Sequence, residues 1–251
     1  MYFVTFIDDM SRKIFYYPLK HKSEVFEHFK LFKSNVERQT GCKIKKLRSD
    51  NGGEFVNNAF DEFLATEGIT RELSVPYTPQ QNGVAERANR TLVETARAMM
   101  VHAGVKKNLW AEAVSTSVYI RNRCPTKFLQ NKTPFEEWCG HKPNVKHFKI
   151  FGCLVVGLNK SGNKSKFEAK GTTYIMVGYS MRSKAYRLLD TNTNDLVEKR
   201  DVLFDEGNFP CRSPNVIKPQ EDDDLISWHC APEDDDSAHD ENISSNNCGQ
   251  K

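Results

Sequence analysis

The sequence predicts an α/β body with a mixed sheet, followed by a small all-β barrel and a disordered acidic tail. Two short runs rich in β-branched and aromatic residues, YFVTFIDD and KIFYYPLK, predict an N-terminal hairpin joined tightly at MSR. Helical and strand patterns then alternate, as in sheets covered by helices. From residue 149, short β-rich runs are separated by Gly, Asn and Ser, which indicates a barrel or sandwich.

The run SEVFEHFKLFKSNVERQTG predicts the first helix. Ser23 is placed to cap its start, and Gly41 follows its end. The side chains at helical spacing on its apolar face are Val25, Phe29, Phe32 and Val36. KIKKLRSD predicts a short strand, NAFDEFLATEG an amphipathic helix that ends at Gly68, and ITRELSVP a further strand. We therefore expect helices and strands to alternate up to residue 76.

A long helix is predicted over residues 84–103, after the polar connector YTPQQNG. Its apolar stripe consists of Ala85, Ala88, Leu92, Ala96 and Met99. A second helix begins near Asn108 and ends before Pro125, with a buried side made of Trp110, Ala113, Val114, Ser117 and Ile120. TPFEEWCG predicts a short helix with Thr133 as its cap and Pro134 at its first position.

The barrel is expected from four runs: FKIFGCLVVGL, TYIMVGYS, AYRLLD and LVEKRDVLF. After about residue 210, Pro, Asp, Ser and Asn dominate, which is typical of disorder. The predicted domains are therefore 1–144 for the α/β body, 145–210 for the barrel and 211–251 for the tail.

Composition narrows the class of protein. Hydrophobic residues make up 38% of the chain, which supports a packed core. The seven cysteines include no C-x-x-C pair, which argues against a disulfide framework and a zinc finger. No run resembles a signal peptide, and none approaches the roughly 20 apolar residues of a membrane helix. We expect an intracellular protein of the nucleus or cytoplasm, with no membrane partner.

The charge is divided unevenly. Residues 211–251 hold three basic and ten acidic side chains, whereas residues 1–210 hold 33 basic and 23 acidic ones. A basic folded body with an acidic tail is consistent with a nucleic-acid partner. It is equally consistent with surface charge that only keeps the protein in solution.

Asp50 is the first candidate for chemistry. It ends the strand in LRSDNGGEF, where a Gly-Gly turn lets the backbone bend and leaves room for a ligand. Glu86, near the start of the long helix, lies on the face opposite the alanine stripe. Converging carboxylates suit Mg²⁺ or Mn²⁺. Taken singly, however, Asp50 is typical of a turn and Glu86 of a helix dipole contact.

The combination resembles the integrase core of Copia-type (pseudoviral) long-terminal-repeat retrotransposons. The matching stretches are YFVTFIDDMSR, YPLKHKSEVFEHFK, LRSDNGGEF, GITRELSVPYTPQQNGVAERANRTL, WAEAV and TPFEEW, which lie within residues 1–140. The downstream runs resemble the Src-homology-3-like domain found beside this core in retroviral polymerases. The resemblance implies a ribonuclease-H-like fold and DNA integration by 3′-end processing and strand transfer.

This resemblance also implies roles for individual residues. The family uses an Asp, Asp, Glu triad with 35 residues between the last two, and 35 residues separate Asp50 from Glu86. These two side chains would hold Mg²⁺ or Mn²⁺, with Asn89 facing the same site. Homo-oligomers acting on element and target DNA are expected. The basic residues expected to contact DNA phosphates are Lys43, Lys45, Lys46, Arg87, Arg90 and Arg97.

The first aspartate of the triad has no counterpart here. In the family it lies on a strand upstream of the YFVTFIDD run, and this sequence opens at that run. Asp8 and Asp9 are expected to serve the hairpin turn, for instance by pairing with Arg12. The fold would then lack a central strand, leaving sheet edges open beside the gap. We therefore expect a truncated retroelement copy or a clipped gene model, inactive in strand transfer.

Two alternatives remain. The chain is then either a host-adopted nucleic-acid-binding protein without catalysis, or a ribonuclease-H-like nuclease that uses Asp8 or Asp9 in place of the absent carboxylate.

Overall fold

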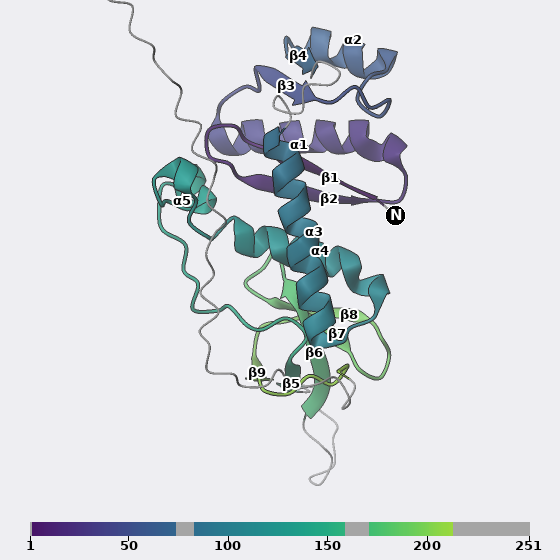
Figure 1. Cartoon of the computed structure of the whole chain (residues 1–251), viewed down its shortest axis with the longest axis vertical. Helices are drawn as coiled ribbons and strands as arrows, with labels where there is room; N and C mark the ends of the chain where they lie inside the picture. The colour runs from purple at the N-terminus through teal and green to yellow at the C-terminus, as the bar shows by residue number, and fades with distance from the viewer. Residues whose placement is uncertain (1, 74–82, 159–170, 213–251) are drawn as a thin grey trace, which may run out of the picture. The chain divides into compact units, whose positions relative to one another are not determined.

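A computed structural model describes residues 2–73, 83–158 and 171–212 of the chain (Figure 1). Strand β1 (Tyr2–Ile7) pairs antiparallel with β2 (Ile14–Leu19), as the β-branched and aromatic runs predict. Residues 8–13 connect the strands, so the connection is longer than the predicted MSR turn. The acidic tail lies outside the described residues from residue 213 onward.

The connection between β1 and β2 is built by its own polar side chains. Asp8 Oδ2 accepts hydrogen bonds from the Ser11 backbone N–H at 2.8 Å and from Ser11 Oγ at 2.6 Å. Asp9 pairs with Arg12 at 2.6 Å, and Arg12 has a positive φ of 58°. Asp8 and Asp9 therefore serve the turn, as the sequence predicts.

Helix α1 (Val25–Thr40) follows a single 3-10 turn, η1 (Lys22–Glu24). The four predicted apolar side chains are its buried ones, together with Lys33, and Gly41 ends it in the left-handed conformation at φ 70°. The Ser23 cap is wrong, because Ser23 lies inside the 3-10 turn. The Glu24 carboxylate instead fixes the entry by accepting a hydrogen bond from the Lys20 N–H at 2.9 Å.

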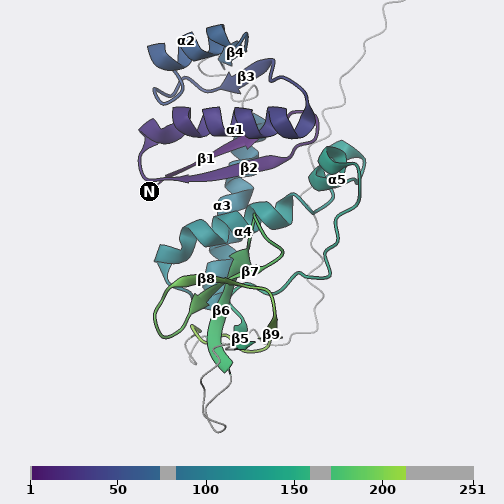
Figure 2. The ribbon, with the colours of Figure 1, turned by 180° about the vertical axis from the view of Figure 1, so that it is seen from behind.

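Strands β3 (Lys46–Ser49) and β4 (Thr70–Leu73) form a parallel pair, connected through α2 (Asn58–Thr66). Within the described residues this pair shares no ladder with β1–β2, so the predicted mixed sheet is two separate two-stranded sheets. Helix α1 lies between the two pairs in both views (Figures 1 and 2). One apolar core joins them, because the Phe29 ring contacts Phe6 at 5.7 Å and Phe60 at 5.1 Å.

Helices α3 (Gly83–Ala103) and α4 (Trp110–Arg121) pack against each other, joined through η3 (Lys107–Leu109). The sequence predicts one buried side for α4, but Thr116 and Val118 are buried as well, while Trp110 and Ile120 are only half-buried. The reason is tertiary: α4 contacts both β2 and the barrel. After η4 (Lys127–Leu129), α5 (Pro134–Cys139) begins with the predicted Thr133 cap, which accepts a hydrogen bond from the Glu136 N–H.

The barrel is a five-stranded antiparallel sheet in the order β8-β7-β6-β5-β9. Its strands are β5 (Leu154–Leu158), β6 (Gly171–Tyr179), β7 (Tyr186–Asp190), β8 (Leu196–Lys199) and β9 (Val202–Asp205). The prediction of one strand over LVEKRDVLF is wrong, since β8 and β9 occupy opposite edges. Only residues 200–201 connect these edges, so the sheet must curl until they nearly meet.

The barrel and the α3–α4 pair share a hydrophobic cluster that includes Ala103, Ala113, Phe151 and Val177. At its border, Thr116 Oγ1 on α4 donates a 3.0 Å hydrogen bond to the Val177 carbonyl on β6. The predicted boundary near residue 145 therefore separates segments that have a common core, and the division at that point stays a prediction.

Candidate functional site

Asp50 lies just after β3, where the buried Ser49 gives way to an exposed turn. Its Oδ1 accepts a hydrogen bond from the Gly52 N–H at 3.1 Å. This is the local bond expected of a turn aspartate. The bond engages one oxygen of the carboxylate, and the residue stays exposed. The structure therefore supports the turn role, and the second carboxylate oxygen could still bind a ligand.

The two glycines after Asp50 do not act as the sequence suggests. Neither is among the glycines with a positive φ, so the turn does not depend on their conformational freedom. A Cβ at Gly52 would lie 2.9 Å from Glu54 Oε2 and 3.1 Å from Asp50 Oδ1, so these two flexible side chains would have to shift. A Cβ at Gly53 would meet nothing within 4 Å. The carboxyl groups of Asp50 and Glu54 therefore both lie close to Gly52.

Glu54 is the residue that sequence reasoning missed. Its carboxyl group lies on the same side of the turn as Asp50 and approaches Lys22 Nζ at 3.6 Å. Its proximity to Asp50 along LRSDNGGEF is the signal that was available. Glu54 therefore adds a second carboxylate near Asp50 at the end of β3, and Lys22 partly balances its charge.

Glu86 lies exposed in the first turn of α3, where a carboxylate also complements the helix dipole. One turn later, Asn89 Oδ1 accepts a 2.7 Å hydrogen bond from Thr5 Oγ1 on β1. Asn89 thus ties the start of α3 to the sheet. Its carbonyl oxygen is engaged in that contact, and its amide donors are the atoms left for a ligand.

The basic residues predicted to contact DNA fall into two groups. Arg87, Arg90 and Arg97 are exposed along α3, on the helix that carries Glu86. The three lysines are exposed too, but Lys43 and Lys45 precede β3 whereas Asp50 follows it. A four-residue strand spans about 13 Å, so these two lysines lie at the other end of the strand from Asp50.

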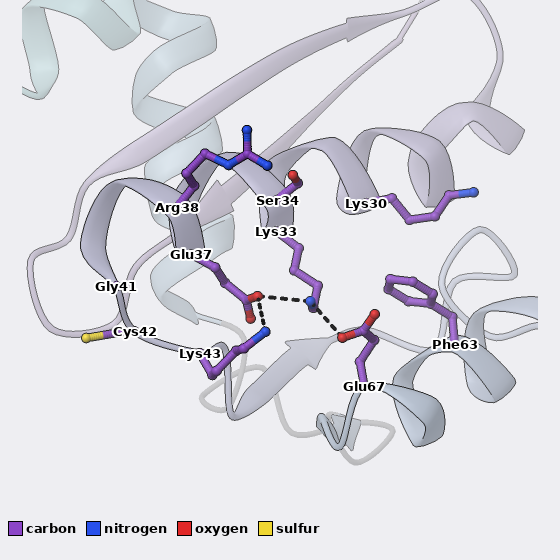
Figure 3. Close-up of a pocket in the computed structure, with 10 residues that line it drawn as sticks. All are labelled: Lys30, Lys33, Ser34, Glu37, Arg38, Gly41, Cys42, Lys43, Phe63 and Glu67. Atoms are coloured by element: carbon purple, nitrogen blue, oxygen red, sulfur yellow. Dashed lines mark hydrogen bonds and ion pairs between the residues drawn. The ribbon is translucent and has the colours of Figure 1, made fainter.

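Lys43 takes part in an ion-pair network between α1 and α2 (Figure 3). Glu37 Oε2 pairs with Lys33 Nζ at 3.0 Å and with Lys43 Nζ at 3.1 Å, and Lys33 also pairs with Glu67 at 2.8 Å. Burial raises the pKa of Glu37, but hydrogen bonds from the Ile44 N–H and from the two lysines outweigh it, so the pKa falls to about 2. The Lys46 ammonium pairs with Glu72 at 2.6 Å. Lys43 and Lys46 are therefore held in pairs that contact with a phosphate would disturb.

A cavity of about 920 Å³ runs between β1 and α3. The side chains that line it include Phe3 and Val4 of β1, Val93 and Met100 of α3, and Glu54. Arg97 lies at this cavity as well. The cavity therefore links the turn after β3 to the predicted DNA-contacting face of α3.

Comparison with known proteins decides the family. Residues 1–79 match the integrase core domain, and residues 153–217 match the retroviral polymerase SH3-like domain. The chain carries an integrase core domain followed by a retroviral polymerase SH3-like domain. This confirms the resemblance carried by the sequence motifs. The match to the core includes Asp50 and ends before Glu86.

The relatives are polyproteins of transposons. The chain is 44% identical over 205 residues to the retrovirus-related Pol polyprotein from transposon TNT 1-94 of Nicotiana tabacum, which covers 82% of this chain. It is 38% identical over 231 residues to that from transposon RE2 of Arabidopsis thaliana, covering 90%. The chain spans only 15% and 16% of these two polyproteins.

A solved structure of a simian T-cell lymphotropic virus intasome, in complex with the PP2A regulatory subunit B56 gamma, is also similar. The TM-score is 0.44 at 13% identity, and the alignment covers 80% of this chain and 70% of that one.

The donor chemistry at Asp50 and Glu86 fits a hard divalent cation, since both side chains are exposed carboxylates. Across residues 2–73, 83–158 and 171–212, however, no three His, Cys, Asp or Glu side chains form a group that could hold a metal ion. The convergence of Asp50 and Glu86 therefore stays a prediction. In the same ranges no helix is long and apolar enough to cross a membrane.

Proposed function

We propose that this chain is the integrase segment of a retrotransposon Pol polyprotein, which acts on element and target DNA by phosphoryl transfer. Two exposed carboxylates carry this proposal: Asp50 just after β3 and Glu86 in the first turn of α3, with 35 residues between them in a chain that carries an integrase core. In the intact polyprotein we expect homo-oligomers to assemble on DNA.

Asp50 and Glu86 are the residues that would hold Mg²⁺ or Mn²⁺. Such an ion lowers the pKa of an attacking water or hydroxyl and stabilises the leaving oxygen. The chain's own contribution is to position these carboxylates: the Gly52 N–H orients Asp50, and the Thr5–Asn89 hydrogen bond fixes the turn of α3 after Glu86. Arg87, Arg90 and Arg97 add exposed positive charge for phosphates along the same helix.

We propose further that this chain alone does not catalyse strand transfer. Two carboxylates bind hard cations weakly and cannot position two ions, and no third acidic side chain completes a cluster with them among the described residues. We propose that Asp8 and Asp9 serve the hairpin turn instead, which is supported by the contacts of their carboxylates with Ser11 and Arg12. Catalysis by Asp8 or Asp9 as a nuclease is therefore disfavoured.

The same observations favour DNA binding without chemistry as a second candidate function. The test uses the full chain, Mn²⁺, and oligonucleotides in binding and joining assays. We expect binding that weakens steeply with salt, because phosphate contacts release counterions, and that is unchanged by Asp50→Asn. Joining should be absent. Joining that Asp50→Asn abolishes would contradict the inactivity, and failure to bind DNA at low salt would contradict the function itself.

A further inference from the structure

Two positively charged side chains, Lys13 and Arg123, lie over aromatic rings of α5. Lys13, just before β2, places its Nζ 4.7 Å from the centre of the Trp138 ring and 5.1 Å from that of Phe15. Arg123, just after α4, lies over the neighbouring ring of the same helix, with Cζ 4.8 Å from the centre of Phe135. Because Phe135 and Trp138 are three residues apart on a helix, their side chains share one face, and so do the two cations above them.

The Arg123 guanidinium is stacked on two rings. Its Cζ lies 3.5 Å from the centre of the Tyr119 ring as well as over Phe135. NH1 donates one hydrogen bond, to the Tyr119 carbonyl at 3.1 Å. A planar guanidinium between aromatic rings can offer its remaining N–H groups only from its edge, which is the geometry that binds oxyanions in a fork.

Comparable cations of this chain have acidic partners, but among the residues that the structure describes Lys13 and Arg123 have none. Lys33 pairs with Glu37 and Glu67, Lys149 with Glu206, and Arg187 with Glu112 and Glu198. In the described part of the chain, neither Lys13 nor Arg123 has a carboxylate within ion-pair distance, although both are half-buried. Two like charges placed together without a counter-ion repel each other, and an anion between them would relieve the repulsion.

The electrostatics agree with this geometry. Burial lowers the pKa of Lys13 and of Arg123, and their mutual repulsion lowers the pKa of Lys13 further. The other titratable groups that act on this pair are Asp8, Cys139, Tyr119 and Tyr179, and Arg123 in turn helps to lower the pKa of His147, which burial lowers most. Asp8 is the carboxylate in this set, and its Oδ2 already accepts hydrogen bonds from Ser11.

We propose that Lys13 and Arg123 form a binding site for a phosphate group above the Phe135–Trp138 face of α5. Lys13 supplies a point charge, and Arg123 supplies directed N–H donors. The phosphate is part of a nucleic-acid backbone or of a free phosphate compound, which share this chemistry. The site does not depend on the proposed function, because Asp50, Glu86 and the cations of α3 take no part in it.

The test follows the indole N–H resonance of Trp138 in the full chain, assigned with Trp138→Phe, during titration with inorganic phosphate at constant ionic strength. We expect a saturable shift that chloride does not reproduce. Lys13→Met should weaken phosphate binding by about tenfold or more, the factor expected for one charge-assisted contact. Arg123→Lys, which keeps the charge but loses the fork, should also weaken it, whereas Lys142→Met, at an exposed neighbouring lysine, should not.

An equal shift with chloride, or a Lys13→Met variant that retains its fold and binds phosphate as tightly as the parent, would overturn the site. A short DNA duplex then separates the two sources. If the duplex displaces phosphate, as followed by the Trp138 resonance, the site binds a nucleic-acid backbone. Phosphate binding that DNA does not displace assigns it to a free phosphate compound.

Discussion

Thr5 on β1 donates a 2.7 Å hydrogen bond to Asn89 on α3, across 84 residues of sequence. This bond joins the open N-terminal hairpin to the helix that carries Glu86. It is a polar contact beside apolar packing, so it fixes the rotation of α3 about its axis as well as its distance from β1. The direction in which Glu86 points depends on that rotation.

Removing the Thr5 hydroxyl tests this contact. Thr5→Val keeps the shape of the side chain and leaves the part-buried Asn89 carbonyl without its donor, so the free energy of unfolding should fall by about 1 kcal/mol. Thr5→Ser keeps the hydroxyl donor, so its free energy of unfolding should fall less. Urea denaturation measures both. A loss in Thr5→Ser as large as or larger than that in Thr5→Val would contradict the hydrogen bond as the main contribution of Thr5.

Acid should weaken the α1–α2 network through Glu37. Its pKa is about 2 in the folded protein, below the ordinary value near 4.5, so its stabilisation is present above about pH 4.5 and is lost as the pH falls toward 2. Glu37→Gln should therefore destabilise the protein by roughly 2 kcal/mol at pH 7 and by much less at pH 3. Denaturation at both pH values measures the free energy of unfolding. Glu62→Gln, at an exposed carboxylate on α2, serves as the control.

The barrel is held to α4 by a two-point ion pair. Arg187 Nε and NH2 each donate to the Glu112 carboxylate at 2.7 Å, and both side chains are half-buried. Glu112→Gln should lower the free energy of unfolding by about 1–3 kcal/mol, because charge-assisted bonds to a half-buried guanidinium are lost. Arg200→Ala, which breaks an exposed pair with Asp201, should cost under about 1 kcal/mol. Similar losses in both would contradict a special role for the Glu112 pair.

Gly152 and Gly140 have similar backbone conformations but different surroundings, so alanine substitutions there distinguish backbone strain from a steric clash. Gly152 and Gly140 have φ values of 84° and 75°, but a Cβ at Gly152 would lie 2.1 Å from Ala103 Cβ, whereas one at Gly140 would meet nothing within 4 Å. Gly140→Ala should cost about 1 kcal/mol of backbone strain. Gly152→Ala should lower the melting temperature much more, since it pushes the barrel away from α3. Equal melting temperatures would exclude close packing at Ala103.

Local signals predicted much of this fold, and long-range contacts did not. Helical spacing identified the buried face of α1 from Val25 to Val36, and Gly41 and Thr133 marked helix ends because each acts within one turn. Burial of Thr116 was missed because it depends on Val177, in a different part of the fold. Within the candidate site, the position of Asp50 and its turn role followed from the sequence, whereas Glu54 and the Thr5–Asn89 bond required the structure.

We propose that Asp50 and Glu86 face one cation site. Titration of the isotopically labelled chain with Mn²⁺, followed by paramagnetic broadening of its amide resonances, tests it directly. We predict weak, saturable broadening of residues 50–54 and residues 84–90 together, which Asp50→Asn and Glu86→Gln should each remove from both segments. Broadening confined to one segment, or unchanged in either variant, would contradict a shared site.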